Sequence, residues 1–150
     1  MTAVIAPLID EQICFALYSA HRALTARYRE LLAPLGVTYP QYLVLLALWE
    51  HDGLSVSGLG DRLQLDSGTL SPLLRRLEAA GLLRRTRSDD DERTVIVRLT
   101  RKGDALRADT AGIQDSICAA TGLEPDVLGA LQRQIAELAE RVRAGVDRQT

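Results

Sequence analysis

Aromatic side chains, cysteines and long apolar runs are all scarce in this chain of 150 residues. The longest apolar run, YLVLLALW, is much shorter than the roughly 20 residues that a membrane-spanning helix needs, so we expect no membrane partner. The N-terminal MTAVIAPLID lacks the basic segment of a secretory signal, and we therefore expect a cytoplasmic protein. In that reducing compartment a cysteine is more often redox-active or simply buried than part of a structural disulfide.

The sequence also lacks the residue spacings of common metal sites and catalytic sites. Its two cysteines and two histidines, His21 and His51, are scattered without zinc-type spacing, so we expect no metal and no cofactor. A nucleophile elbow, a phosphate-binding glycine loop and a thioredoxin Cys-x-x-Cys are all missing. We therefore expect a protein that is not an enzyme.

The overall composition is that of an ordinary globular chain, with 47% hydrophobic and 25% charged residues, and predicts one domain over residues 1–150. The net charge of −2 gives no overall basic surface for nucleic acid. Basic residues nevertheless gather between Arg75 and Lys102, where nine of them stand against five acidic residues, a local excess of four positive charges. The nine are Arg75, Arg76, Arg84, Arg85, Arg87, Arg93, Arg98, Arg101 and Lys102.

Helical periodicity dominates the first half of the chain. Residues 10–32 form an amphipathic pattern, and a helix that begins near Pro40 is apolar nearly all round, as expected in a core. Two short helical segments follow, SVSGLGDRLQL and DSGTLSPLLRRLEAAGLL. In the second, Asp66 or Ser67 is the expected N-cap and Gly81 the expected C-terminal glycine. Pro72 is tolerable there if the helix begins at or after Ser67.

After Gly81 the period changes from helical to alternating. LLRRTR and TVIVRLT predict a two-stranded hairpin around the polar loop SDDDER. Thr100 is expected to cap one long helix, RKGDALRADTAGIQDSICAAT, which Gly122 ends. The last helix, from Pro125, carries a heptad-like apolar seam that is typical of packing against partner helices, namely Leu128, Leu131, Ile135, Leu138, Val142 and Val146.

This order of elements predicts a mainly α fold with a small β-hairpin, a winged helix-turn-helix. The winged module is expected over about residues 37–100, and the helices at about 10–36 and 101–147 are expected to form a homodimer interface. A two-fold dimer matches a palindromic site on double-stranded DNA.

The chemistry of the second short helix suits DNA. Arginine binds guanine edges, hydroxyls reach phosphates or bases, and small residues permit close approach. The candidate DNA-binding residues are Ser67, Gly68, Thr69, Ser71, Pro72, Arg75 and Arg76, with Arg87 and Arg93 in the hairpin. Arg93 is expected in the minor groove, and ion pairs of Arg87 and Arg93 with the acidic loop would reduce its repulsion of phosphate. The alternative is that these arginines are solvated surface charges and the hairpin is a connector.

Cys14 begins a row of polar side chains on the first helix. Tyr18, His21, Thr25 and Tyr28 follow it at spacings of four and three, so all five share one stripe. Tyr28 nevertheless lies about 21 Å from Cys14 along the same helix, so it can reach only the thiol of a partner subunit whose first helix crosses in the antiparallel direction. Phenolic hydroxyls that donate to sulfur stabilise the thiolate, the form that attacks peroxides. The alternative is that Cys14 is a small buried residue, the usual fate of a free cysteine.

Two long segments carry a family resemblance, CFALYSAHRALTARYRELLAPLGVTYPQYLVLLALWE and LGDRLQLDSGTLSPLLRRLEAAGLLRRTRSDDDERTVIVRLTRKG. They closely resemble the MarR-type transcriptional regulators, in particular the two-cysteine organic hydroperoxide resistance regulators (OhrR). The resemblance covers about residues 10–106. Within it, Cys14, Tyr28, TYPQY and LDSGTL are specific to that branch. His21 departs from the smaller polar residue expected there.

The resemblance implies a dimeric repressor that leaves its operator when an organic hydroperoxide oxidises Cys14 to a sulfenic acid. Tyr28 and Tyr39 match tyrosines of the opposite subunit that bond to the thiol, and we include Tyr18 as its neighbour on the stripe. Arg93 matches the wing arginine, and Cys118 is placed like a second cysteine that resolves the sulfenic acid as an intersubunit disulfide. The alternative functions are a MarR-type repressor that senses a small aromatic ligand and a thiol-dependent peroxidase.

Overall fold

The first long helix is followed by a tight turn that redirects the chain. In the computed structural model, which describes residues 7–147, the 3-10 helix η1 (Ile9–Glu11) leads into α1 (Ile13–Leu32). Within this chain, α1 buries only Leu32. A second 3-10 helix, η2 (Ala33–Leu35), starts at the Ala33-Pro34 step, and Gly36 then adopts the left-handed φ of 68° that ends the turn.

Helix α2 (Tyr39–Glu50) forms the centre of the core, as its apolar sequence predicts. It begins with a capping box in which Thr38 and Gln41 bond each other's backbone N–H groups. Val44, Leu45 and Leu48 are almost completely buried along it. The amphipathic helices α3 (Val56–Leu63) and α4 (Ser67–Ala79) then pack their leucines against this helix.

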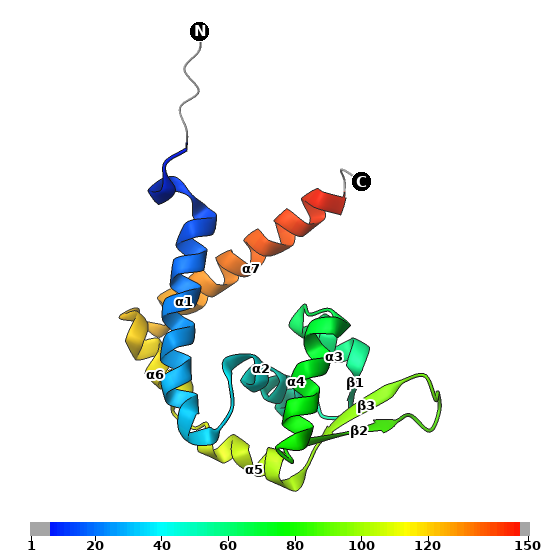
Figure 1. Ribbon diagram of the computed structural model, residues 1–150. Helices are drawn as coiled ribbons and strands as arrows, with labels where there is room; N and C mark the ends of the chain where they lie inside the picture. The colour runs from blue at the N-terminus through cyan, green and yellow to red at the C-terminus, as the bar shows by residue number, and fades with distance from the viewer. Residues whose placement is uncertain (1–6, 148–150) are drawn as a thin grey trace. The chain divides into compact units, whose positions relative to one another are not determined.

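The caps of α4 confirm the sequence prediction. Asp66 is the N-cap, and its carboxylate accepts the Thr69 N–H at 2.7 Å. Gly81 follows the last turn with a φ of +73°, which suits glycine. In Figure 1, α4 leads directly into the strands of the wing.

The sheet has one strand more than the sequence predicts. Strands β2 (Leu83–Arg87) and β3 (Val95–Leu99) form the expected antiparallel hairpin, with Arg85 opposite Val97. A further strand, β1 (Leu54–Ser55), pairs with the other edge of β3 to give the order β1-β3-β2. The prediction of a two-stranded hairpin was incomplete because two residues are too few to show an alternating pattern.

The predicted long helix after Thr100 is also interrupted. Thr100 is the N-cap and accepts the Gly103 N–H, as expected, but α5 (Arg101–Asp109) ends early. The Thr110 hydroxyl donates to the Arg107 carbonyl, and Gly112 has a φ of +84°. This left-handed residue breaks the helical backbone before α6 (Ile113–Thr121) begins. The prediction of one continuous helix was therefore wrong.

The chain divides into two compact units, Met1–Ala111 and Gly112–Thr150. The second contains α6 and α7 (Pro125–Asp147), joined through Gly122 with a φ of 67°. Its apolar seam is exposed at Leu131, Ile135, Leu138 and Val142, while the side chain of Val146 lies outside the described residues. The boundary between the units falls inside the expected dimerisation segment 101–147, and the single domain over residues 1–150 stays a prediction.

Within residues 7–147 no single helix is long and apolar enough to cross a membrane. The bent pair Ile13–Leu35 and Tyr39–Glu50, with 72° between its two parts, meets the same criteria by length and composition only.

Candidate functional site

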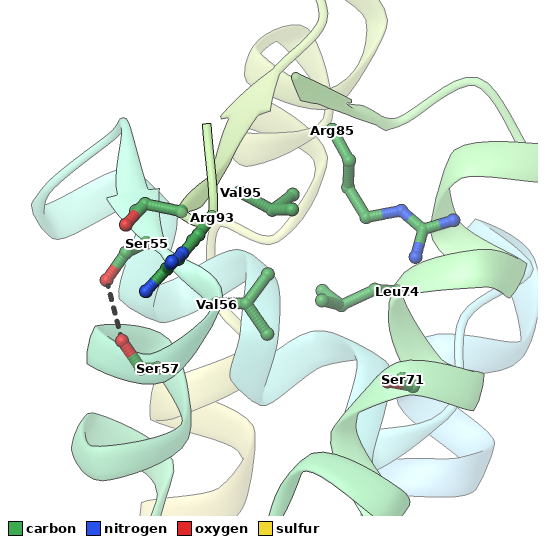
Figure 2. A pocket seen from close by; sticks show the side chains of 9 residues that line it. Ser55, Val56, Ser57, Ser71, Leu74, Arg85, Arg93 and Val95 are labelled. Atoms are coloured by element: carbon green, nitrogen blue, oxygen red, sulfur yellow. Dashed lines mark hydrogen bonds between the residues drawn. The ribbon is translucent and has the colours of Figure 1, made fainter. Parts of the chain in front are cut away.

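A cleft of about 350 Å³ lies between the wing, which is the β2–β3 hairpin, and the helices α3 and α4. Figure 2 shows side chains from all three sides, with Arg93 from the wing, Ser55 and Ser57 from the start of α3, and Ser71 from α4. The Ser55 hydroxyl caps α3 by accepting the Gly58 N–H and lies 3.2 Å from the Ser57 hydroxyl. Hydroxyls at a helix N-terminus beside an arginine are suited to bind phosphate.

Ser55 and Ser57 were missed by sequence reasoning. The signal that could have found them is the S-x-S pair at the start of SVSGLGDRLQL, at an expected helix N-terminus.

The candidate residues of α4 divide by exposure as their spacing predicts. Leu70, Leu73, Leu74 and Leu77 are buried against the core. The remaining face is exposed or partly exposed, and carries Ser67, Gly68, Thr69, Ser71, Pro72, Arg75 and Arg76.

The acidic wing loop is held by hydrogen bonds rather than by the expected ion pairs. One Asp91 oxygen accepts the Arg93 N–H at 3.0 Å, and the other accepts the Thr94 hydroxyl at 3.1 Å. Among the described residues, neither Arg87 nor Arg93 forms an ion pair with the loop, so that expectation was wrong. The physical reason is that a carboxylate two residues from an N–H closes a local turn more readily than it reaches a long side chain. Arg93 thereby keeps its charge available in the cleft.

Arg85, by contrast, is neutralised by its neighbour Glu78 at the end of α4. Its Nε and Nη2 donate to one Glu78 oxygen at 3.1 and 2.8 Å, and its backbone N–H donates to the other at 2.9 Å. These hydrogen bonds hold the pKa of the Glu78 carboxyl below its usual value. Arg85 therefore attaches the wing to α4 and adds no net charge to the cleft.

The two cysteines are free and lie in different compact units. Cys14 is exposed and is the second residue of α1. On the same helix the Tyr18 ring is exposed and stacks under the Arg22 guanidinium, 5.6 Å from the ring centre. Cys118 is partly buried on α6, with its sulfur 4.0 Å from the Leu123 carbonyl oxygen.

Tyr28 of α1 and Tyr39, the first residue of α2, meet within one chain. Their ring centres are 4.5 Å apart, and the Tyr42 ring, which sequence reasoning missed, lies 6.0 Å from Tyr28. Burial, followed by the proximity of Tyr39 and Tyr42, raises the pKa of Tyr28 to about 12. Burial also raises the pKa of Tyr39 and of Tyr42. At neutral pH these phenols therefore keep their protons and remain hydrogen-bond donors.

A larger, mainly apolar pocket of about 610 Å³ opens beside Tyr39. Leu43, Leu63 and Leu65 contribute to its apolar lining. His21 and Thr25 line it from α1, which gives the unexpected histidine of the sequence a definite position. The pocket thus offers apolar space next to a phenolic donor.

Three sets of similarities identify the chain. The MarR family model matches residues 37–95. The HTH-type transcriptional regulator TtmR of Methylorubrum extorquens is 48% identical over 91% of this chain and 70% of its own length. The organic hydroperoxide resistance transcriptional regulator of Bacillus subtilis is 48% identical over 73% of this chain and 74% of its own. The chain belongs to the MarR family of transcriptional regulators.

Solved structures of AbfR of Staphylococcus epidermidis have the same fold. Overoxidised AbfR bound to DNA superposes with a TM-score of 0.71 at 32% identity, over 89% of this chain and 94% of that one. Disulfide-formed AbfR superposes with a TM-score of 0.60 at 34% identity, over 87% of this chain and 92% of that one. The predicted winged helix-turn-helix fold is therefore confirmed, and this MarR-family chain is a DNA-binding regulator rather than a peroxidase.

The raised pKa of Tyr28 in this MarR-family protein can be tested by following phenolate absorbance against pH. Between pH 10 and about 12 the unfolded chain has lost the Tyr28 proton while the folded chain keeps it, so the free energy of unfolding falls as pH rises through this range. We expect the phenolate absorbance of folded protein to show a late step near pH 12 that Tyr28→Phe removes. An unchanged late step in Tyr28→Phe would assign it to another tyrosine.

Proposed function

We propose that this regulator is a cytoplasmic, homodimeric repressor that senses organic hydroperoxide through Cys14. The reduced dimer binds a palindromic operator, and oxidation of Cys14 releases it. The observation that carries the proposal is the pairing of Tyr28 with Tyr39 as two protonated phenols, with Tyr28 about 21 Å along α1 from Cys14 of its own chain. Residues 10–36 and 101–147 supply the dimer interface that brings the partner's thiol to them.

The exposed apolar side chains support this dimer. Ile13 and Phe15 flank Cys14 and are 62% and 40% exposed, and the α7 seam is exposed as well. A chain that leaves so many large apolar side chains in water within one protomer gains free energy by covering them with a second copy. Antiparallel crossing of two α1 helices would carry each Cys14 toward the partner's tyrosines.

The reaction at the thiol is a two-electron oxidation. The Cys14 thiolate attacks the peroxide, the O–O bond breaks, an S–O bond forms and the alcohol leaves with a proton. The phenolic hydroxyls of Tyr28 and Tyr39 donate hydrogen bonds to the thiolate before it reacts. The 610 Å³ pocket beside Tyr39 holds the organic substituent, which favours organic hydroperoxides over hydrogen peroxide.

The test is a gel-shift titration of the operator complex with cumene hydroperoxide. Release should be complete at about one equivalent per subunit, because each thiol reacts once and has no catalytic cycle. Release by phenolic ligands and not by hydroperoxide would instead favour the repressor that senses an aromatic ligand.

We also propose that the cleft and the exposed face of α4 bind the operator DNA. The residues of this DNA-binding surface are Ser67, Gly68, Thr69, Ser71, Pro72, Arg75 and Arg76, with Arg87 and Arg93 on the wing. Arg93, which forms no ion pair among the described residues, is proposed to enter the minor groove.

Arg93→Ala should weaken operator binding by about 1–3 kcal/mol, because it removes a minor-groove guanidinium. If each subunit neutralises about three phosphates, log K for the wild-type dimer should fall with log salt at a slope near −5. Arg85→Ala is not a suitable control, since Arg85 holds the wing, whereas Arg27→Ala removes an exposed arginine that pairs with Glu30 on α1. Equal affinities for wild type and Arg93→Ala would remove the wing from the interface.

We further propose that Cys118 of one subunit resolves the sulfenic acid on Cys14 of the other. The Cys118 sulfur attacks the oxidised sulfur, an S–S bond forms and water leaves. Overoxidised AbfR was solved with DNA bound and a disulfide form was solved separately, which supports the disulfide as the releasing state. The bridge needs α-carbons within about 7 Å, so the helices that carry the cysteines must move together and change the spacing of the two α4 helices.

Non-reducing gels should therefore show a covalent dimer after hydroperoxide treatment of wild type. Dithiothreitol should reverse it, and Cys118→Ser should lack it. A covalent dimer in Cys118→Ser, or monomeric wild type that has nevertheless lost DNA, would assign the resolving thiol to an external molecule.

A further inference from the structure

Pro72 lies in the interior of the recognition helix α4. The helix begins at Ser67, so the proline is its sixth residue and falls beyond the first turn, where proline is readily accepted. Proline has no N–H, and residue 72 therefore cannot make the hydrogen bond that an α-helix normally directs to the Gly68 carbonyl. In a helix interior a proline ring also crowds the carbonyl four residues before it, which favours a tilt of that carbonyl away from the helix axis.

The affected carbonyl lies on the face of α4 that points away from the core. At about 100° per residue, Gly68 and Pro72 lie within about 30° of the direction opposite the four buried leucines. Arg75 falls on the same outward stripe, at positions i, i+4 and i+7. Gly68 is exposed and has no side chain to cover its own carbonyl.

From this arrangement we infer that the Gly68 carbonyl reads a base in the operator, an inference that rests on the proposed placement of α4 in the major groove. When α4 enters the major groove, a carbonyl acceptor on its outward face meets the donors that bases present there. Those donors are the exocyclic amino groups of cytosine (N4) and adenine (N6), while guanine and thymine present acceptors in the same place. Gly68 and Pro72 thus form one specificity element, in which the proline frees the acceptor and the glycine lets it approach.

This element differs in kind from the arginines of the same face. Arg75 and Arg76 supply donors, which suit guanine, whereas the face otherwise offers acceptors only through small hydroxyls. A missing helical hydrogen bond lowers the stability of α4. The presence of Pro72 in this helix is explained if the freed Gly68 carbonyl accepts a hydrogen bond from a base.

The test uses reduced protein without hydroperoxide, so its outcome is independent of the thiol chemistry. Wild-type protein first selects its site from a randomised duplex. Each cytosine or adenine of one half-site is then replaced by 2-pyrimidinone or purine, which lack the amino group. We expect one position at which the loss of the amino group weakens wild-type binding about tenfold.

Pro72→Ala and Pro72→Gly are the matched variants. Both restore an N–H at position 72, and the two differ in helix propensity, since glycine is about 1 kcal/mol less favourable than alanine in a helix interior. At the position where wild type is sensitive, loss of the amino group should lower the DNA affinity of both variants less than twofold. At every other position the change in affinity should match that of wild type. A wild-type protein insensitive at every position, or variants that keep its sensitivity, would overturn the assignment. Loss of discrimination in Pro72→Gly alone would show an effect of helix stability and would overturn it as well.

Discussion

The Cys14→Ser protein is expected to remain on its operator at hydroperoxide concentrations that release wild type completely. Serine is close in size to cysteine and keeps a hydrogen-bonding group for the tyrosines of the proposed dimer, so DNA affinity should stay within about twofold of wild type. A hydroxyl is not oxidised by peroxide, and no sulfenic acid forms. The measurement is operator affinity before and after treatment with cumene hydroperoxide.

Cys118→Ser is the matched control, because it removes the other thiol and leaves the first oxidation step intact. A dimedone adduct at Cys14 should appear in Cys118→Ser and be absent from Cys14→Ser. If Cys14→Ser still releases DNA on oxidation, the sensing group lies elsewhere in the chain.

Gly103→Ala should have the largest effect on stability. An added Cβ would overlap the Leu82 carbonyl oxygen and lie 2.9 Å from the Leu82 carbonyl carbon. Leu82 is buried, and its carbonyl accepts the Thr100 N–H, so it has little freedom to move. Gly103 is fixed as well, since its carbonyl accepts the Trp49 indole N–H at 3.0 Å. Relief of the overlap must therefore break hydrogen bonds that join α5 to α2 and the wing.

We expect Gly103→Ala to lower the free energy of unfolding by at least about 3 kcal/mol, measured by urea denaturation. Gly145→Ala on α7 is the control, because an added Cβ there meets no atom within 4 Å. That substitution should leave stability unchanged or raise it by up to about 1 kcal/mol, since alanine favours helices. Similar urea midpoints for Gly103→Ala and Gly145→Ala would mean that α5 shifts away from Leu82 with little loss of unfolding free energy.

Local signals in the sequence determined most of the fold. Asp66 and Gly81 bound α4 because a carboxylate accepts free N–H groups and glycine adopts a positive φ without strain, and both effects act within one turn. The buried leucines of α4 follow from helical spacing in the same way. Helix type, order and caps could thus be predicted, together with the outward face of the recognition helix.

Features that depend on distant pairing could not be predicted. The two residues of β1 become a strand only because β3 offers them an open edge, and their own sequence has no period to detect. The break before α6 was missed because Gly112 is tolerated in a helix and a left-handed φ is visible only in the folded backbone.

The candidate site shows the same division. The amino-acid sequence specifies which chemical groups are present, namely a thiol, a row of hydroxyls and a basic segment around a wing. The folded chain settles which of these groups meet and which charges stay unpaired. It paired Tyr28 with Tyr39, tied Arg85 to Glu78 and left Arg93 in the cleft. The reason is physical, since covalent neighbours fix helix caps, whereas burial, ion pairing and pKa depend on groups that the fold brings together from different helices and strands.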